Sequence, residues 1–185
     1  MFIALTGTPG TGKTSVTKEL ETKGIQILSL NDLALSHNFI DGVDKKRGSI
    51  ILDLDKINSY LQKNSNIHSK PTIIEGHASH WLTQPEWIII LRCHPKELQK
   101  RLNTKQWKKE KIYENVEAEI LDIILCEATE IHPANKLLEI DTTYITIQEV
   151  SEIILNLIKT DFSHTKKYGI GKIDWSDEIL KKHDR

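Results

Sequence analysis

Short apolar runs alternate along this chain with segments whose apolar residues recur at helical spacing. Strands are predicted at 2–6, 24–30, 72–75, 87–91 and 137–140. The runs at 72–75 and 87–91 are almost wholly apolar, as expected of central parallel strands that are buried on both faces. Because strand and helix patterns take turns, the sequence predicts an α/β fold with three layers, in which helices flank a mainly parallel sheet.

Helical spacing predicts helices at about 14–23, 53–63 and 108–129. Asp53 and Asp55 are interpreted as opening the second helix, where the helix dipole favours negative charge. The third helix is predicted to bury one continuous apolar stripe, made of Ile112, Val116, Ile120, Ile123 and Ile124.

Local signals mark the start of three further helices. Asn31 can cap a short helix that runs through Ala34, and Pro95 suits the first turn of a helix whose leucines face inward. Thr146 and Glu149 have the spacing of a capping box, which predicts the start of an amphipathic helix near the C-terminus.

Composition indicates one domain followed by a tail. The chain has 185 residues, is 38% hydrophobic and carries a formal net charge of −1. We therefore expect a domain at 1–160 and a polar tail at 161–185 that is anchored by Tyr168, Ile173 and Trp175. No secretory signal is recognisable, and no apolar run approaches the ~20 residues of a membrane span. A cytoplasmic protein without a membrane partner is expected.

The two cysteines and the basic residues have different implications. Cys93 and Cys126 lie in apolar surroundings without metal-ligand spacing, so both are predicted to be buried free thiols rather than zinc ligands. The stretch 92–111 holds eight Lys or Arg and only two Glu. This local excess indicates either a binding partner or a solvated face.

The strongest chemical signal is GTPGTGKT, which begins at residue 7 and lies between a predicted strand and a predicted helix. It fits the P-loop pattern in full. Gly10 and Gly12 allow the backbone N–H groups to point at phosphate oxygens, and Lys13 adds a catalytic charge at the β- and γ-phosphates of ATP. Thr14 offers a hydroxyl to Mg²⁺, and Ser15 can hold the α-phosphate.

A P-loop alone does not name a reaction, because kinases, GTPases and motor ATPases share it. The chain has no NKxD-type guanine motif, which weakens the GTPase interpretation, and its small size weakens that of an oligomeric motor. A small kinase or a stand-alone ATPase remains.

Further motifs follow in an order that resembles the adenylate kinase isoenzyme 6 family, and most of all its archaeal branch. They are LTGTPGTGKTS at the start, ILDLD at 51–55, IIEGH at 73–77, RLNTKQWKKEKIYENVEAEI at 101–120, EIDTT at 139–143 and GKIDW at 171–175. The resemblance implies a P-loop nucleotide kinase with a short monophosphate-binding segment at about 27–50 and a short lid at about 103–113. It also places the loop at 141–143 against the adenine.

The same resemblance implies an activity and partners. Family members are similar to nucleoside monophosphate kinases that convert ATP and AMP to two ADP with Mg²⁺, and other nucleoside monophosphates are candidate acceptors. They are also linked to maturation of the small ribosomal subunit, which implies ATPase activity and a ribosomal protein or rRNA as partner. Two hypotheses therefore stand: an adenylate-type kinase, and an ATP-switched assembly factor with little kinase activity.

The run TIIEGH is interpreted as the Walker B strand. Its carboxylate, Glu75, is expected to emerge beside the P-loop and to hold Mg²⁺ through water or orient a nucleophile. The resemblance implies that His77 positions water or couples the site to a partner. Arg92, Arg101 and Lys105 are candidates for the positive charge around the donor and transferred phosphates, with a solvated helix face as the alternative.

Three positions depart from the family pattern. Glu75 stands where members have aspartate, and Lys105 stands where they have arginine. Leu35 stands where eukaryotic members have an arginine that would help to anchor AMP. A lysine cannot grip a phosphate bidentately as a guanidinium does, and Arg47 is close enough in sequence to replace the charge missing at position 35.

Overall fold

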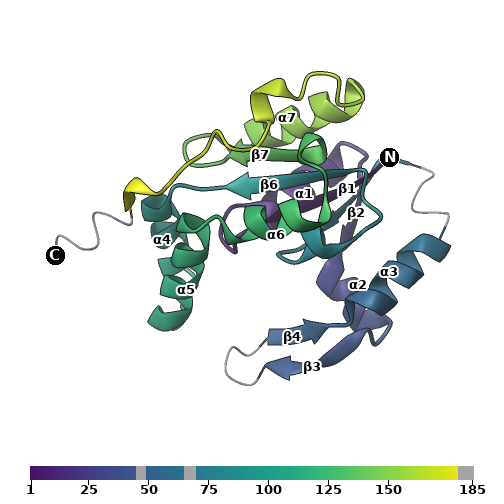
Figure 1. Ribbon diagram of the computed structural model, residues 1–185, viewed down its shortest axis with the longest axis horizontal. Helices are drawn as coiled ribbons and strands as arrows, with labels where there is room; N and C mark the ends of the chain where they lie inside the picture. Colours follow the sequence, from purple (N-terminus) through teal and green to yellow (C-terminus); the bar gives the residue numbers. More distant parts are fainter. Residues whose placement is uncertain (45–48, 65–69, 179–185) are drawn as a thin grey trace.

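The computed structural model describes residues 1–44, 49–64 and 70–178, and it has the three-layer α/β architecture that the hydrophobic pattern predicts (Figure 1). All five predicted strands are present and form one sheet in the order β2-β5-β1-β6-β7, with every neighbouring pair parallel. They are β1 Phe2–Gly7, β2 Gln26–Ser29, β5 Thr72–Glu75, β6 Trp87–Arg92 and β7 Leu137–Asp141. Because β1 is the middle strand, the P-loop that follows it opens at the centre of the sheet's carboxyl edge.

Helices cover both faces of this sheet. One face carries α1 (Lys13–Thr22) and α7 (Ile147–Lys159). The other carries α2 (Leu30–Ser36), α3 (Leu54–Lys63) and α6 (Ile123–Ile131). The predicted capping box at the start of α7 is confirmed.

Two more helices form a separate pair beyond the carboxyl end of β6 (Figure 1). They are α4 (Pro95–Asn103) and α5 (Lys109–Ile120), and an apolar cluster of their own holds them together. Short 3₁₀ helices lie at Ser79–Trp81, Ala134–Lys136 and Lys166–Tyr168. Within the described part of the chain, no helix is long and apolar enough to cross a lipid bilayer.

The central strand shows why the predicted strands are so apolar. All six residues of β1 are buried. Ile3 and Leu5 face the layer of α1 and α7, whereas Phe2 and Ala4 face the opposite layer. Complete burial of a large apolar side chain contributes about 1.5–3 kcal/mol. The P-loop therefore starts from a rigidly packed strand.

The prediction of one helix over 108–129 is wrong. The chain breaks at Asp122, whose left-handed φ of 53° separates α5 from α6. The carboxylate of Asp122 accepts a hydrogen bond from the guanidinium of Arg92, and this contact holds the turn. Because the helix axis changes direction there, Ile123 is 38% exposed rather than buried.

Three local predictions have mixed outcomes. Ser29, not Asn31, caps α2, because its hydroxyl accepts a hydrogen bond from the N–H of Asp32 at 3.2 Å. Asp53 caps α3 as predicted. Cys93 is buried as predicted, but Cys126 is exposed because it lies on the solvent side of α6.

The segment predicted to bind the monophosphate contains a hairpin that the hydrophobic pattern did not indicate. Strands β3 (Ile40–Asp44) and β4 (Ser49–Leu52) pair antiparallel and form a second small sheet. Figure 1 shows this hairpin projecting from the domain beside α2 and α3. Arg47, the proposed replacement for the charge missing at Leu35, lies outside the described residues.

The tail runs across the sheet edge and reaches α4. Gly169 forms an isolated bridge with Leu138, and the N–H of Gly171 donates to Glu139 Oε2 at 2.8 Å. Farther along, the Trp175 ring meets His94 edge-on, with 5.0 Å between centroids. Figure 1 shows the same path, in yellow, from the end of α7 across β7 toward α4. The tail is thus packed on the domain as far as the structure describes it.

Candidate active site

The P-loop joins the end of β1 to the start of α1 and requires glycine for two different reasons. Gly7, Gly10 and Gly12 all have positive φ angles, of 138°, 99° and 106°. A Cβ on Gly7 would lie 2.4 Å from the carbonyl oxygen of Leu91, whereas a Cβ on Gly12 would meet nothing within 4 Å. Gly7 is therefore needed for packing against β6, and Gly12 is needed for its backbone conformation at the N-terminus of α1.

Lys13 is buried at the base of the loop. Its ammonium donates to the carbonyl oxygens of Gly7 at 2.5 Å and Thr8 at 3.2 Å. Desolvation lowers the pKa of Lys13 to about 8; Lys105 lowers it further, whereas Glu75 and Glu119 act in the opposite direction. A cation that is costly to keep buried gains most from an incoming phosphate, so the geometry prepares Lys13 for polyphosphate binding.

Glu75 and Thr14 meet across the loop. Glu75 ends β5, directly beside β1, and Thr14 Oγ1 donates to its Oε2 at 3.5 Å. Thr14 is exposed at the cavity, so its hydroxyl can exchange this contact for another partner. Mg²⁺ prefers oxygen ligands and usually keeps several waters while binding one or two protein oxygens and substrate phosphates. The hydroxyl and carboxylate present here fit that ion.

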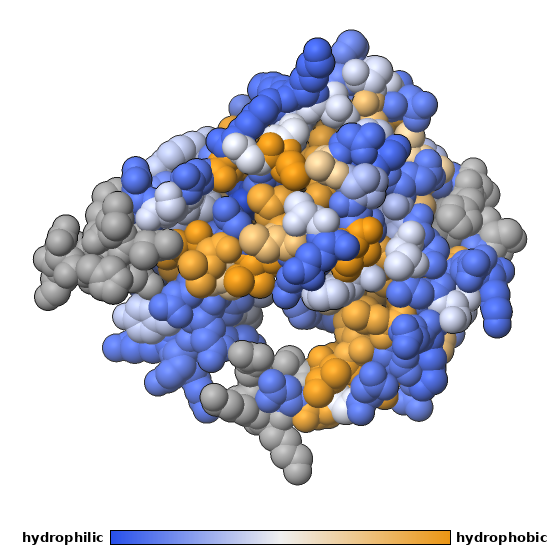
Figure 2. All heavy atoms as spheres, viewed as in Figure 1, coloured by the Kyte–Doolittle hydropathy of each residue, from blue (hydrophilic) through white to orange (hydrophobic). Residues whose placement is uncertain are grey.

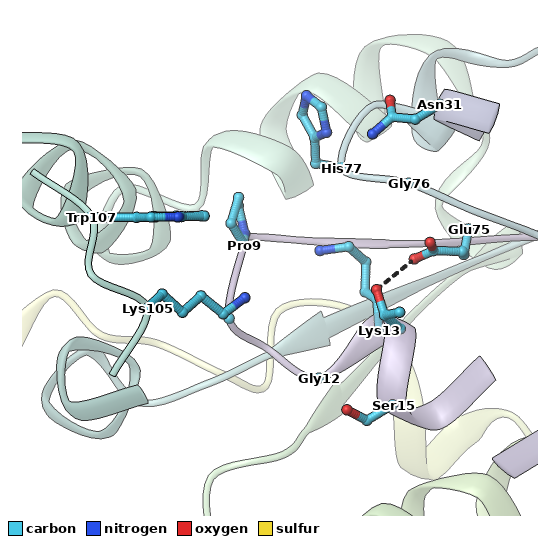
Figure 3. Close-up of a pocket in the computed structure, with 12 residues that line it drawn as sticks. Pro9, Gly12, Lys13, Ser15, Asn31, Glu75, Gly76, His77, Lys105 and Trp107 are labelled. Carbon is cyan, nitrogen blue, oxygen red and sulfur yellow. Dashed lines mark hydrogen bonds between the residues drawn. The ribbon is translucent and has the colours of Figure 1, made fainter. Parts of the chain in front are cut away.

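These residues line a cavity of about 410 Å³ at the carboxyl edge of the sheet. Figure 3 shows Lys13 in the middle, Glu75 beside it, and His77 with Asn31 on one wall. His77 is exposed to the cavity, and its pKa is lowered by partial desolvation first and then by the charges of Lys13 and Lys111. Glu75 and His77, two residues apart in sequence, thus reach the same cavity as the P-loop.

The opposite wall comes from the connection between α4 and α5, the predicted lid. Lys105 and Trp107 line the cavity there (Figure 3). The Nζ atoms of Lys105 and Lys111 lie 5.3 Å and 4.4 Å from the centre of the Trp107 ring. The indole therefore holds two ammonium groups beside the site through cation–π contacts.

A second cavity, of about 490 Å³, lies on the other side of the P-loop, against the start of α7. Ile145 and Ile147 contribute apolar walls, and Gln148 contributes an amide. Arg101 lines this cavity rather than the first one. Its guanidinium donates to the carbonyl oxygens of Thr142 at 2.8 Å and Thr143 at 3.0 Å, so it holds the loop that the family resemblance places against adenine.

The prediction that Arg92 faces the phosphates is wrong. Arg92 is only 2% exposed, and its guanidinium is surrounded by the carboxylates of Glu119, Glu139 and Asp122. A cation inside the domain needs such partners to offset its desolvation. Arg92 therefore joins β6, β7 and α5 and does not act in the cavity.

Sequence reasoning missed the residues that brace the P-loop. Glu119 on α5 is 2% exposed and accepts hydrogen bonds from the Thr8 hydroxyl, from Arg92 Nε and from the N–H of Cys93. In sequence Glu119 is one polar residue on an amphipathic helix, so no local signal marks it. Trp107 and Asn31 also line the cavity, although the sequence predicted only a helix cap for Asn31.

Solved structures of other proteins define the class. A shikimate kinase from Bacteroides thetaiotaomicron has a TM-score of 0.56 at 17% identity, covering 86% of this chain and 98% of that one. A shikimate kinase from Acinetobacter baumannii has a TM-score of 0.53 at 15% identity, covering 86% and 93%. Together with the P-loop geometry, these similarities show that the protein has the fold of the P-loop kinases.

Sequence comparison then gives the family. A family model described as an AAA domain matches residues 3–122. A protein of Archaeoglobus fulgidus named "Putative adenylate kinase" is 41% identical over 179 residues, covering 97% of this chain and 94% of that one. A protein of the same name from Methanosarcina acetivorans is 40% identical, covering 97% and 100%. The chain belongs to this archaeal adenylate kinase family, as the order of its motifs indicates.

Proposed function

We propose that this protein is a nucleoside monophosphate kinase that transfers the γ-phosphoryl group of ATP to AMP or a related monophosphate. One observation supports the proposal most: Lys13, Thr14, Glu75 and His77 line one cavity whose far wall carries Lys105. Phosphoryl transfer needs positive charge and exclusion of water around the moving group rather than a protein nucleophile. The relatives named adenylate kinase support the same class of reaction.

The donor nucleotide would span both cavities. The glycine-rich turn and the N-terminus of α1 present N–H groups to the phosphates, and Ser15 lies where the chain can hold the α-phosphate. The adenine would enter the second cavity between Arg101 and the apolar start of α7. Arg101 would then act by holding the loop at 142–143 against the base.

The transferred group would lie above Lys13. On phosphate binding, the Lys13 ammonium can leave the carbonyls of Gly7 and Thr8 and follow the charge as it moves between oxygens. Lys105 can approach from the opposite wall. Thr14 and Glu75 would hold Mg²⁺, which when bound neutralises charge on the β- and γ-phosphates. His77 is placed to orient the acceptor oxygen, or a water when no acceptor is present.

We also propose ATPase activity, linked to maturation of the small ribosomal subunit, as a second function. The ATPase proposal is supported by the expected AMP site. A cation would be needed there for the AMP phosphate, but the position holds Leu35, which is 55% exposed. Val43 and Ile51 of the hairpin are 60% and 49% exposed as well, and Figure 2 shows hydrophobic residues gathered on this projecting part of the molecule. An apolar hairpin and the exposed lysines at 96, 100, 108 and 109 suit a ribosomal protein and rRNA better than a small phosphate.

The two functions are separated by measuring ADP formation from ATP and Mg²⁺ with and without AMP or CMP. Kinase function predicts that a monophosphate accelerates ADP formation severalfold, with two ADP per turnover from AMP and one ADP and one CDP per turnover from CMP. If no nucleoside monophosphate accelerates ADP formation, the kinase proposal is wrong. Continued ADP release without an acceptor would then support ATPase activity as the function of the site.

Variants test the assigned roles in the same assay. Lys13→Ala is expected to abolish both activities, with Lys18→Ala, at an exposed position of α1, as the control. His77→Ala is expected to lower turnover more than ATP affinity. Equal losses of affinity and turnover in His77→Ala would contradict a role in orienting water or acceptor.

A further inference from the structure

A polar cluster lies behind the segment that carries His77. It joins Thr6 of β1, His80 of the 3₁₀ helix at Ser79–Trp81, and Glu127 of α6, whose side chain is 37% exposed. Thr6 and His80 are 0% and 1% exposed. His80 Nδ1 lies 3.1 Å from Thr6 Oγ1, and His80 Nε2 lies 2.9 Å from Glu127 Oε2. Thr6 Oγ1 in turn lies 3.2 Å from the carbonyl oxygen of His77.

When His80 is neutral, the cluster has fewer hydrogens than its three hydrogen bonds need. An ionised Glu127 can only accept, so His80 Nε2 must carry a hydrogen and Nδ1 is left as an acceptor. The carbonyl oxygen of His77 is also only an acceptor. The Thr6 hydroxyl has a single proton and faces both acceptors, so one of these two buried contacts is lost.

One additional proton on the His80–Glu127 pair removes the conflict. Nδ1 then donates to Thr6 Oγ1, and the Thr6 proton is free for the His77 carbonyl. The result is the same whether the added proton resides on the imidazole or on the carboxyl group, because either arrangement leaves a hydrogen on Nδ1. Each of the three contacts that link Glu127, His80, Thr6 and the His77 carbonyl then has one donor and one acceptor.

We propose that His80 is a positioning residue of the active site: a proton held by the His80–Glu127 pair commits the Thr6 hydroxyl to the His77 carbonyl and so fixes the segment that carries the His77 ring. This proposal rests on the proposed function only in giving His77 a role in turnover. His80 itself does not line the cavity that holds Lys13 and Glu75.

The surroundings make this link specific to His77. Neighbouring carbonyls of the segment have other partners: Ser79 Oγ donates to Gly76 O at 3.0 Å, and His132 Nε2 donates to His80 O at 2.8 Å. The titratable groups that face His80 are Glu127, His77 and His132. Of the carbonyls from 76 to 80, the His77 carbonyl is the one whose hydrogen bond depends on Thr6.

The direction of the pH effect follows from the same environment. Burial lowers the pKa of His80, while Glu127 opposes that effect and the nearby histidines add to it. The pair therefore gains its proton as the pH falls below the ordinary range of histidine. In mildly acidic solution the Thr6 proton is committed to the His77 carbonyl, and as the pH rises that proton is shared between the His77 carbonyl and His80 Nδ1.

The test compares the pH dependence of kcat for ADP formation, from about pH 5.5 to 8, in matched variants. Wild-type kcat should show a step of roughly fivefold that follows the titration of the pair, since one hydrogen bond is at stake. Thr6→Val and His80→Gln should abolish this step and leave the KM for ATP unchanged. Thr6→Ser keeps the hydroxyl and should retain the step, as should Thr129→Val, at an exposed position of α6.

A second readout does not depend on activity. The amide nitrogen of Ala78 belongs to the same peptide group as the His77 carbonyl, so its NMR shift should titrate together with the His80 ring. In Thr6→Val this shift should become independent of pH, while the His80 ring still titrates. An Ala78 shift that follows His80 in Thr6→Val, or that never follows it in the wild type, overturns the proposal. A wild type without ATP turnover but with the coupled NMR titration would contradict the proposed function alone.

Discussion

Replacing Lys13 by methionine tests whether the buried Lys13 ammonium lowers the stability of the protein before nucleotide binds. Methionine has similar length and no charge, so it keeps the packing at the base of the loop. In the folded protein the pKa of Lys13 falls from 10.5 to about 8, chiefly through desolvation. That fall corresponds to roughly 3 kcal/mol of lost stability while the ammonium is protonated.

The sign of the pH dependence is determined by this lowered pKa. Below pH 8 both the folded and unfolded chains bind the Lys13 proton, and the full destabilisation is present. As the pH rises from about 8 toward 10.5, the folded chain loses the proton first, and the destabilisation disappears. The stability advantage of Lys13→Met over the wild type should therefore shrink by roughly 3 kcal/mol across this range.

Urea unfolding of the nucleotide-free protein, followed by tryptophan fluorescence, measures this difference at about pH 7 and about pH 10. Other groups titrate equally in both proteins and cancel in the comparison. Lys18→Met, which removes an exposed lysine from the same helix, controls for the change in net charge. A difference between Lys13→Met and the wild type that is the same at both pH values would refute the reasoning.

Three further changes have defined outcomes. Gly7→Ala should lower the free energy of unfolding by about 2–5 kcal/mol in urea titrations, because it adds positive-φ strain and a clash with Leu91. Gly24→Ala, which meets no atom, should cost only about 1–2 kcal/mol, and equal losses would contradict the packing role of Gly7. Arg92→Met should cost about 3–5 kcal/mol at neutral pH and less in acid, where the buried carboxylates it leaves unpaired can protonate; a pH-independent loss would argue against this. ATP binding near pH 8.5 should take up close to one proton by calorimetry in two buffers, since phosphate raises the pKa of Lys13, and Lys13→Met should take up none.

The prediction of the fold from the sequence succeeded where local pattern and burial agree. The runs that became β1, β5 and β6 were recognisable because strands covered on both faces are almost wholly apolar, and these three are the central strands of the sheet. The hairpin β3–β4 was missed because it lies outside the core, where Val43 and Ile51 are exposed. Apolar and polar residues also do not alternate along the sequence of β3. The break at Asp122 was missed because its cause is a contact with Arg92, 30 residues away in sequence.

The residues of the site likewise divide into those that local sequence predicted and those that only the structure assigned. The P-loop was recognisable because a phosphate-binding turn requires particular residues at adjacent positions. Glu75 was expected beside it because parallel strands end at one edge, and His77 was proposed from the family resemblance. The basic stretch 92–111 could not be sorted in this way. Its arginines look alike in sequence, yet Arg92 is enclosed by carboxylates and Arg101 holds a loop.

By itself the sequence determined the five strands of the main sheet, the P-loop and the family, because these depend on local spacing and backbone requirements. Only the tertiary structure decided which charges face the cavity, which are neutralised inside the domain, and how Thr6, His80 and Glu127 meet behind His77. The reason is physical: burial and pairing depend on groups that are distant in sequence, and a side chain's charge has no fixed effect until its neighbours are in place.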